Sequence, residues 1–236
     1  MKPSIILTRP EKDNIKFSSK ISEVNKGSNI INLPLIEIEI LGREINFPEN
    51  SNLIITSANG VEALSKNTKI RNFNIITAGD NSAEIASKLG FQRVFSAYKK
   101  KSKISGEIAI ANFIKENFSK GEKFIHISAD VTKGNLEKLI VAENFFYKRE
   151  IFYKSKQNKL SKEKIKEIQA LQECLVVFFS ERTAKIFIDN FIDLSKFSAV
   201  TLSKQIADSI ANYNFANIIY PEFPTENSLI EIINKL

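Results

Sequence analysis

The sequence is poor in the side chains that hold metals and form disulfides. Its 236 residues include one cysteine, one histidine and no tryptophan. A lone cysteine cannot form a disulfide within the chain. With only one cysteine and one histidine, zinc sites built from several Cys or His ligands are also excluded. A Cys–His catalytic dyad is equally hard to place. We therefore expect chemistry that needs neither a bound metal nor a thiol.

The two rare residues themselves have structural interpretations. His126 lies in KFIHISAD, where apolar neighbours on a predicted strand favour a packed histidine over a general base. Cys174 precedes the apolar run LVVFF, which favours an inert buried thiol over a nucleophile.

Long apolar runs are also missing. No stretch approaches the roughly 20 apolar residues of a membrane span, and the N-terminal run ends at Thr8 after three apolar residues. We therefore expect no membrane partner, no signal peptide and residence in the cytoplasm. A hydrophobic content of 43% is ample for the cores of one or two domains.

Positive charge is in excess, with a net charge of +7, and most of the excess lies in the middle of the chain. Residues 38–157 hold 19 basic and 13 acidic side chains, and the densest cluster is Lys99, Lys100, Lys101 and Lys103. A solvated loop is the favoured interpretation of this cluster. The alternatives are binding of a polyanionic small ligand or of a nucleic-acid backbone. Because the sequence has no helix-turn-helix, RNP or zinc-finger signature, we expect no nucleic-acid partner.

The chain repeats itself weakly. ITSANGVEAL at 55–64 is echoed by FFSERTAKIF at 178–187, and the segment from Thr77, TAGDNSAEIASKLG, is echoed from Thr201 by TLSKQIADSIANYN. The offsets, 123 and 124 residues, are nearly equal. A duplicated strand–turn–helix with small hydroxylated residues at each strand end predicts two similar α/β lobes whose ligand-facing edges could close on something between them.

Apolar segments alternate with amphipathic ones along the whole sequence. Strands are predicted at 4–8, 29–32, 52–56, 74–77, 93–96, 123–127, 145–153, 175–179, 197–201 and 216–220. Helices are predicted at 10–26, 58–66, 81–89, 105–118, 133–142, 161–172, 181–192, 203–212 and 225–235. This order predicts an α/β fold with parallel sheets flanked by helices.

Two segments, LPLIEIEI at 33–40 and KREIFYKS at 148–155, alternate apolar and polar residues with no helix attached. They predict a two-stranded β-ribbon between the lobes. Domain 1 would comprise 1–32 and 158–236, domain 2 would be the insertion 41–148, and 33–40 with 149–157 would be the linker strands. The fold class expected is two flavodoxin-like parallel-sheet domains that are circularly permuted relative to each other.

The order of ILTRP, LPLIEIEI, ITSANGVEAL, AGDNSAEIASKLGF, FIHISAD, VVFFSERTAKIF, TLSKQIADSI and YPEFPTENSLIEII resembles that of the uroporphyrinogen-III synthase family over essentially the whole chain. The resemblance implies cyclisation of hydroxymethylbilane to uroporphyrinogen III, with inversion of ring D and loss of water. It implies a small-molecule substrate and no cofactor. We expect a monomer, and it stays open whether the preceding pathway enzyme hands the substrate over.

The resemblance also implies a catalytic residue. A tyrosine on the return strand is the family's favoured proton donor for the departing hydroxyl, and Tyr153 stands in that place. The structural alternative is a half-buried aromatic of the ribbon. Tyr147 and Tyr98 are the other candidates if the alignment is shifted.

The substrate carries acetate and propionate arms, which free amides at helix N-termini and basic side chains can bind. Arg9 is a candidate carboxylate ligand, against pairing with Glu11 or Asp13 at the helix start. Where the family often reads Gly-Pro-Thr-Thr-Ala, the chain has TLSKQ at 201–205, and only Ser203 carries over. Ordinary N-capping is the alternative for each residue in the turns. The predicted substrate-binding set is Arg9, Ser57, Asn59, Gly79, Ser82, Ser180 and Ser203.

Two other function classes remain open from the sequence. A two-lobed chain without catalytic residues could be a small-anion binding module like periplasmic solute receptors, although the expected lack of a signal peptide counts against it. A sugar-nucleotide transferase would also have two lobes, but it would usually be longer and carry a Gly-rich loop and an acidic or histidine base.

Overall fold

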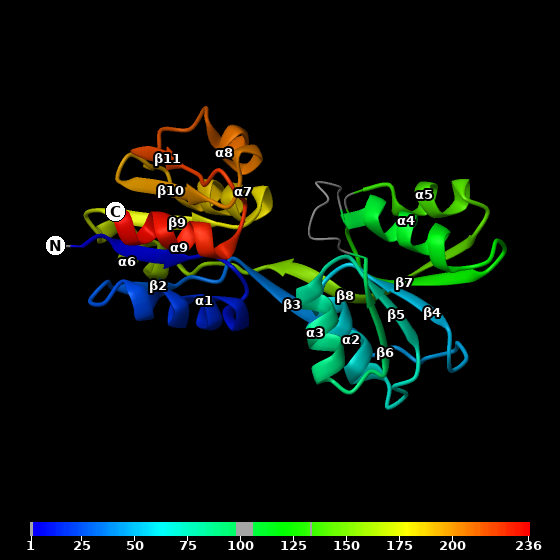
Figure 1. Cartoon of the computed structure of the whole chain (residues 1–236). Helices are drawn as coiled ribbons and strands as arrows, with labels where there is room; N and C mark the ends of the chain where they lie inside the picture. Colours follow the sequence, from blue (N-terminus) through cyan, green and yellow to red (C-terminus); the bar gives the residue numbers. More distant parts are fainter. Residues whose placement is uncertain (1, 98–105, 133) are drawn as a thin grey trace. The chain divides into compact units, whose positions relative to one another are not determined.

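The computed structural model describes residues 2–97, 106–132 and 134–236. They form two compact units, Met1–Glu37 with Lys156–Leu236, and Ile38–Ser155 (Figure 1). We call them unit 1 and unit 2. The lysines at 99–101 and 103, and Tyr98, lie outside the described residues.

Unit 1 is built on a five-stranded sheet in the order β11-β10-β9-β1-β2. The strands are β1 (Ser4–Leu7), β2 (Ile30–Asn32), β9 (Cys174–Phe178), β10 (Phe197–Thr201) and β11 (Asn217–Ile219), and all neighbours pair in parallel. Counted along the chain within the unit, the order is 2-1-3-4-5, that of flavodoxin-like folds. The flavodoxin-like prediction is therefore confirmed for this unit.

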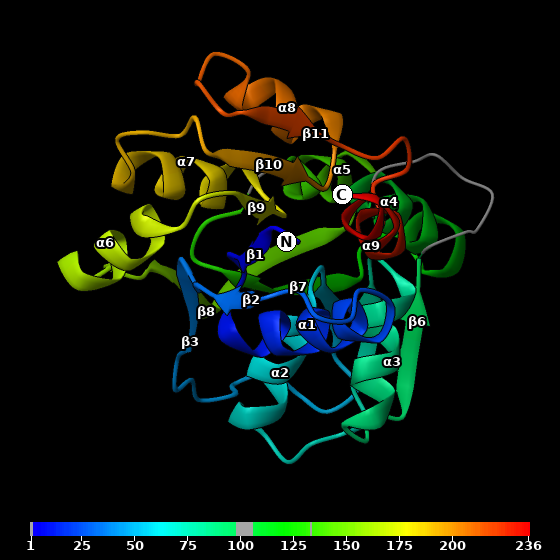
Figure 2. The same ribbon diagram turned by 90° about the vertical axis from the view of Figure 1, so that its left-hand side faces the viewer.

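Five helices cover the two faces of this sheet: α1 (Glu11–Val24), α6 (Lys162–Ala170), α7 (Glu181–Asn190), α8 (Lys204–Ile210) and α9 (Glu226–Lys235). Phe17 of α1 and Leu229 of α9 pack on one face, and Ile168 of α6, Phe187 of α7 and Ile206 of α8 pack on the other. Figure 2 shows α1 and α9 on the side of the sheet opposite α6 and α7. The sheet is thus buried on both faces, which explains its nearly continuous apolar strands.

Unit 2 has a six-stranded sheet in the order β3-β8-β7-β4-β5-β6. Its strands are β3 (Ile36–Ile40), β4 (Asn52–Ile55), β5 (Asn74–Thr77), β6 (Arg93–Ser96), β7 (Lys123–Ala129) and β8 (Phe146–Gln157). Helices α2 (Ala58–Asn67) and α3 (Asp80–Lys88) pack on one face, and α4 (Gly106–Asn117) and α5 (Leu136–Ala142) on the other. In this unit β7 and β8 take the places that β1 and β2 take in unit 1, so the two units are circular permutations of one topology.

The two ribbon strands are neighbours as expected, but they also continue the sheet of unit 2, because β8 pairs with β7 along most of its length. The segment 33–40 is likewise no free linker. Leu33 and Leu35 are buried in a core of unit 1, whereas Ile38 and Ile40 pack against a core of unit 2. Each unit therefore has cores of its own.

The internal repeat is visible in individual hydrogen bonds. The N–H of Gly60 donates to Ser57 Oγ and the N–H of Thr183 donates to Ser180 Oγ, both at 3.2 Å, so each serine caps its helix. At the second repeated turn, Thr77 Oγ1 donates to the carbonyl of Gly79 and Thr201 Oγ1 to that of Ser203, both at 3.1 Å. The weak sequence echo thus marks real structural equivalence.

Both rare side chains are buried as predicted, Cys174 with 2% and His126 with 3% of its surface exposed. Burial raises the pKa of the Cys174 thiol, which keeps it protonated and unreactive. Among the described helices, none has the length and apolar character needed to cross a bilayer.

Candidate functional site

Tyr153 and Ser57 form a hydrogen-bonded pair in unit 2. The phenol oxygen of Tyr153, on β8, lies 2.7 Å from Ser57 Oγ, which also accepts the N–H of Gly60 in the first turn of α2. Tyr153 is 7% exposed, and burial raises the pKa of its phenol above the ordinary value. The hydrogen bond with Ser57 lowers this pKa and the charge of Asp130 raises it, but the net shift is upward. The phenol is therefore protonated at neutral pH and able to donate a proton.

A bulge in β8 directs Tyr153 toward Ser57. Ser128 of β7 pairs with Ile151, but Ala129 pairs with Tyr153, so Phe152 is an extra residue. Because a shift of one residue moves a side chain to the opposite face of a sheet, the bulge brings Tyr153 to the face covered by α2. Phe152 and Tyr153 are accordingly buried in the same core. The bulge has a signal in the sequence, because three successive apolar residues at 151–153 interrupt the alternation of apolar and polar residues along the strand.

Close packing of α2 against the sheet depends on Gly60. A Cβ added there would lie 2.8 Å from Ile55 Cγ2, 3.2 Å from the carbonyl oxygen of Ile127 and 3.7 Å from Tyr153 Cε1. Glycine therefore lets the first turn of α2 approach both the sheet and the phenol ring.

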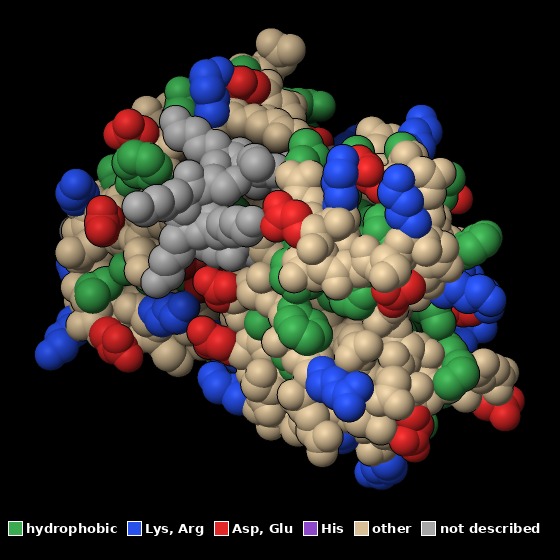
Figure 3. Space-filling model, turned by 45° about the vertical axis from the view of Figure 1, so that its right-hand side comes forward, with side chains coloured by type: hydrophobic (Ala, Val, Ile, Leu, Met, Phe, Trp, Pro, Cys, Tyr) green, Lys and Arg blue, Asp and Glu red, His purple; other side chains and the backbone are tan. Residues whose placement is uncertain are grey.

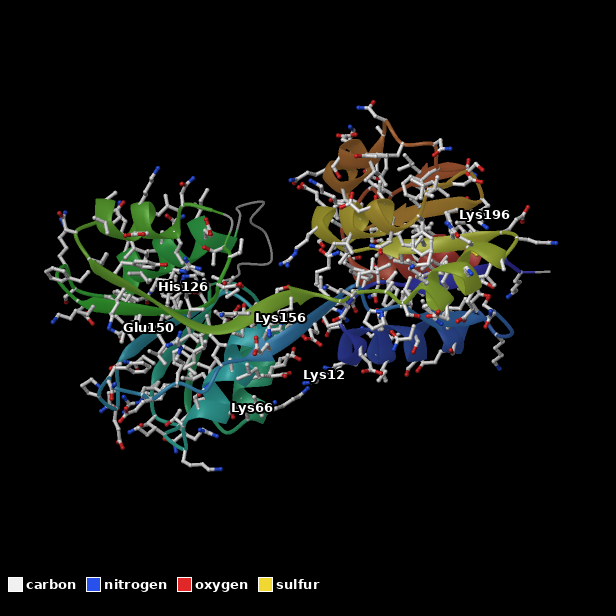
Figure 4. All side chains as sticks on the ribbon, turned by 180° about the vertical axis from the view of Figure 1, so that it is seen from behind. Lys12, Lys66, His126, Glu150, Lys156 and Lys196 are labelled. Atoms are coloured by element: carbon white, nitrogen blue, oxygen red, sulfur yellow. The ribbon has the colours of Figure 1, made fainter. Side chains whose placement is uncertain are left out.

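A second polar cluster, which the sequence interpretation missed, occupies the other face of the same sheet. His126 Nδ1 lies 2.7 Å from the Tyr147 phenol oxygen and His126 Nε2 lies 3.4 Å from Thr56 Oγ1; Figure 4 marks His126 in unit 2. Burial, together with the nearby Arg149 guanidinium, lowers the pKa of His126 to about 4. Tyr147 is thus the partner of a neutral histidine, on the face opposite Tyr153.

The remaining turn residues lie at the carboxyl ends of parallel strands, within their own units. Ser180 and Ser203 cap α7 and α8 in unit 1, and Gly79 is the N-cap residue of α3 in unit 2. Asp80 and Glu181 place carboxylates in the first turns of α3 and α7, which disfavours a bound anion there. The first turn of α2, which contains Asn59, and the first turn of α8 have no acidic residue, so these two turns are more favourable to a bound anion than those of α3 and α7. Ser82, in the first turn of α3, is buried to nearly the same degree as Tyr153, with 8% of its surface exposed.

Arg9 has partners within unit 1. Its guanidinium pairs with Glu226 at 2.6 Å and with Asp13 at 3.4 Å, and lies 4.4 Å from the centre of the Phe179 ring. Lys20 pairs with the same Glu226 at 2.7 Å. Although burial would raise the pKa of Glu226, the hydrogen bonds from Lys20 and Arg9 hold it below its usual value. The sequence left pairing with Asp13 or Glu11 open as the alternative to substrate binding by Arg9, and the structure has the pair with Asp13. The pair with Glu226, 217 residues away, had no sequence signal.

Surface charge is mixed where it can be seen. On the face drawn in Figure 3, Lys and Arg side chains of the described residues are interspersed with Asp and Glu.

No group of three His, Cys, Asp or Glu side chains suited to a metal ion occurs within 2–97, 106–132 and 134–236.

Comparison with known proteins identifies the family. The family model described as Uroporphyrinogen-III synthase HemD matches residues 19–231. The chain belongs to the uroporphyrinogen-III synthase family. No curated protein matches the sequence significantly.

Solved structures of family members share the fold. The chain is similar to the uroporphyrinogen-III synthetase of Helicobacter pylori, with a TM-score of 0.71, 15% identity, and coverage of 98% of this chain and 97% of that one. It is also similar to a mutant uroporphyrinogen III synthase of Thermus thermophilus, with a TM-score of 0.55, 11% identity and 98% coverage of both chains. The resemblance read from the order of sequence segments is therefore confirmed.

Proposed function

We propose that this protein cyclises hydroxymethylbilane to uroporphyrinogen III, with inversion of ring D and loss of water. The family match over residues 19–231 supports the reaction. The observation that carries the assignment to particular residues is the protonated phenol of Tyr153, which is held by Ser57 at the N-terminus of α2. The reaction needs a proton donor of this kind and no redox step.

Tyr153 is the proposed general acid. Its O–H donates to the hydroxyl of the hydroxymethyl group as the C–O bond breaks, so that water leaves and an azafulvenium cation forms beside the Tyr153 phenolate. The substituted position of the terminal pyrrole attacks this carbon, and the resulting spiro intermediate fragments and recloses with ring D inverted. The proton released when the last pyrrole regains its aromaticity balances the one that Tyr153 gave.

The carboxylate arms of the substrate need amide and hydroxyl donors. In this proposal the first turn of α2, with Ser57 and Asn59, is the main carboxylate site. This turn has no acidic side chain, and it lies beside the phenol of Tyr153, which Ser57 contacts. Further proposed contacts are Arg9, Gly79, Ser82, Ser180 and Ser203. We also propose that a monomer catalyses the reaction in the cytoplasm.

Replacing Tyr153 by Phe tests the assignment, because it removes the hydroxyl and keeps the ring in its core. Turnover should fall by up to the ~10²–10⁴-fold credited to general acid catalysis, with the far-ultraviolet spectrum unchanged. The matched control is Tyr147→Phe, which removes a phenol from the same strand but on the opposite face. A variant of Tyr153 with normal turnover and a normal isomer ratio would refute the role.

A further inference from the structure

The side chain of Arg149 binds the end of the strand that pairs with Tyr153. Arg149 precedes Tyr153 by four residues on β8, and its guanidinium reaches across to β7. Nη2 donates to the carbonyl oxygens of Ala129, at 2.6 Å, and Asp130, at 2.7 Å, and Nε donates to Ser128 Oγ at 2.9 Å. One side chain thus holds three consecutive residues.

These three residues are the ones opposite the bulge. The register shift falls between Ser128 and Ala129, where an extra residue on β8 disrupts the regular ladder. Beyond the shift, the N–H of Asp130 donates to the carbonyl oxygen of Tyr153 at 3.0 Å, so the two strands pair again at Tyr153. Arg149 therefore bridges the regular ladder on one side of the bulge and the shifted register on the other.

The chemistry of the side chain suits this task. Arginine presents five N–H donors in a fixed planar fork and stays charged, so it can satisfy several carbonyl oxygens at once. Lysine, with a single flexible ammonium, could reach fewer of these acceptors in a fixed geometry. The bulge also determines which face Tyr153 occupies, because a regular register would put Phe152 opposite Ala129 and direct Tyr153 away from Ser57.

We propose that Arg149 is a positioning residue that holds the β8 bulge and thereby keeps the phenol of Tyr153 against Ser57. The catalytic consequence rests on the proposed role of Tyr153. The structural consequence does not, since it concerns only the register of β7 and β8.

The test compares Arg149→Met and Arg149→Lys with Arg71→Met in the whole protein. Arg71 is the matched control because it also binds loop carbonyls of unit 2, those of Thr68, Ile70 and Leu89 at 2.7–2.9 Å, without contacting the bulge. The first readout is amide hydrogen exchange at Asp130, whose N–H bonds to Tyr153. We expect at least about a tenfold loss of protection in Arg149→Met, an intermediate loss in Arg149→Lys, and none in Arg71→Met beyond that explained by global stability.

The second readout is turnover of hydroxymethylbilane. Since misplacement of a catalytic group by about 1 Å can cost up to ~10²-fold, Arg149→Met should lower kcat by about 10- to 100-fold with little change in KM, and Arg149→Lys should recover part of it. Unchanged protection of Asp130 in Arg149→Met would overturn the proposal whatever the activity. Lost protection with unchanged kcat would limit Arg149 to a structural role and refute its positioning of a catalytic phenol. A wild-type protein without activity would instead refute the proposed function and leave the exchange result valid.

Discussion

Gly60→Ala adds one methyl group at the closest approach of α2 to the sheet. Its Cβ would lie 2.8 Å from Ile55 Cγ2 and 3.2 Å from the carbonyl oxygen of Ile127. Carbon atoms pack at about 3.5–4.0 Å, so the neighbours must move. Ile55 is fully buried and the Ile127 carbonyl belongs to β7, so neither can turn into solvent. The helix must therefore shift away from the strand.

The magnitude follows from two opposing effects. Overpacking a buried site costs about 1–3 kcal/mol, whereas alanine is favoured over glycine in a helix by up to ~1 kcal/mol. Because one contact is below 3.0 Å and the other is with backbone, we take the upper part of the overpacking range. We therefore expect a net loss of about 1–2 kcal/mol in the free energy of unfolding, or about 2–8 °C in melting temperature for a chain of this size. Because the shifted helix carries Ser57, turnover should fall as well.

Thermal unfolding followed by circular dichroism measures the loss. Gly42→Ala is the control, since a Cβ there meets nothing within 4 Å and should change stability by less than ~0.5 kcal/mol. A Gly60→Ala protein as stable as the wild type, or more stable, would refute the packing argument and with it the need for glycine at this position.

Two further substitutions test how the charges of His126 and Arg9 affect the stability of the fold. His126→Gln should flatten the dependence of the free energy of unfolding on pH. The pKa of His126 is about 4 in the folded protein and 6.5 ordinarily, so the wild type loses up to roughly 3 kcal/mol of stability as pH falls from 6.5 to 4. Urea titrations at several pH values that show the same pH dependence for both proteins would contradict this. Arg9→Met should lower stability by about 1 kcal/mol through loss of its ion pairs and of the contact with Phe179. A rise in KM in the same variant would support the proposed contact with a substrate carboxylate, whereas unchanged stability would show that the pairs contribute nothing.

Most of the fold could be predicted from the sequence because its signals are local. Strand and helix segments follow apolar periodicity, and the hydroxyl groups of Ser57, Ser180 and Ser203 mark helix starts through bonds to residues three positions later. The repeat predicted two similar units. Their permutation follows because the strand in ILTRP precedes its copy of the repeat, whereas the strand in FIHISAD follows its copy.

The details of the site depend on contacts that no local pattern encodes. Glu226 meets Arg9 across 217 residues, and Tyr147 meets His126 only because β7 and β8 pair with a particular register. The bulge had a visible signal in the interrupted alternation at 151–153, but its effect on Tyr153 required the pairing with Ala129. Arg149 lay among many basic residues, so charge alone could not single it out.

The isomer composition of the product tests the central claim most directly. Freshly generated hydroxymethylbilane, which also cyclises unaided to the uninverted product, would be incubated with and without the protein, and the oxidised porphyrins separated by chromatography. The account predicts that the wild-type protein yields mainly the type III isomer at a rate well above the unaided reaction, and that Tyr153→Phe shifts the product toward type I. A type I product at the unaided rate in the presence of folded wild-type protein would contradict it.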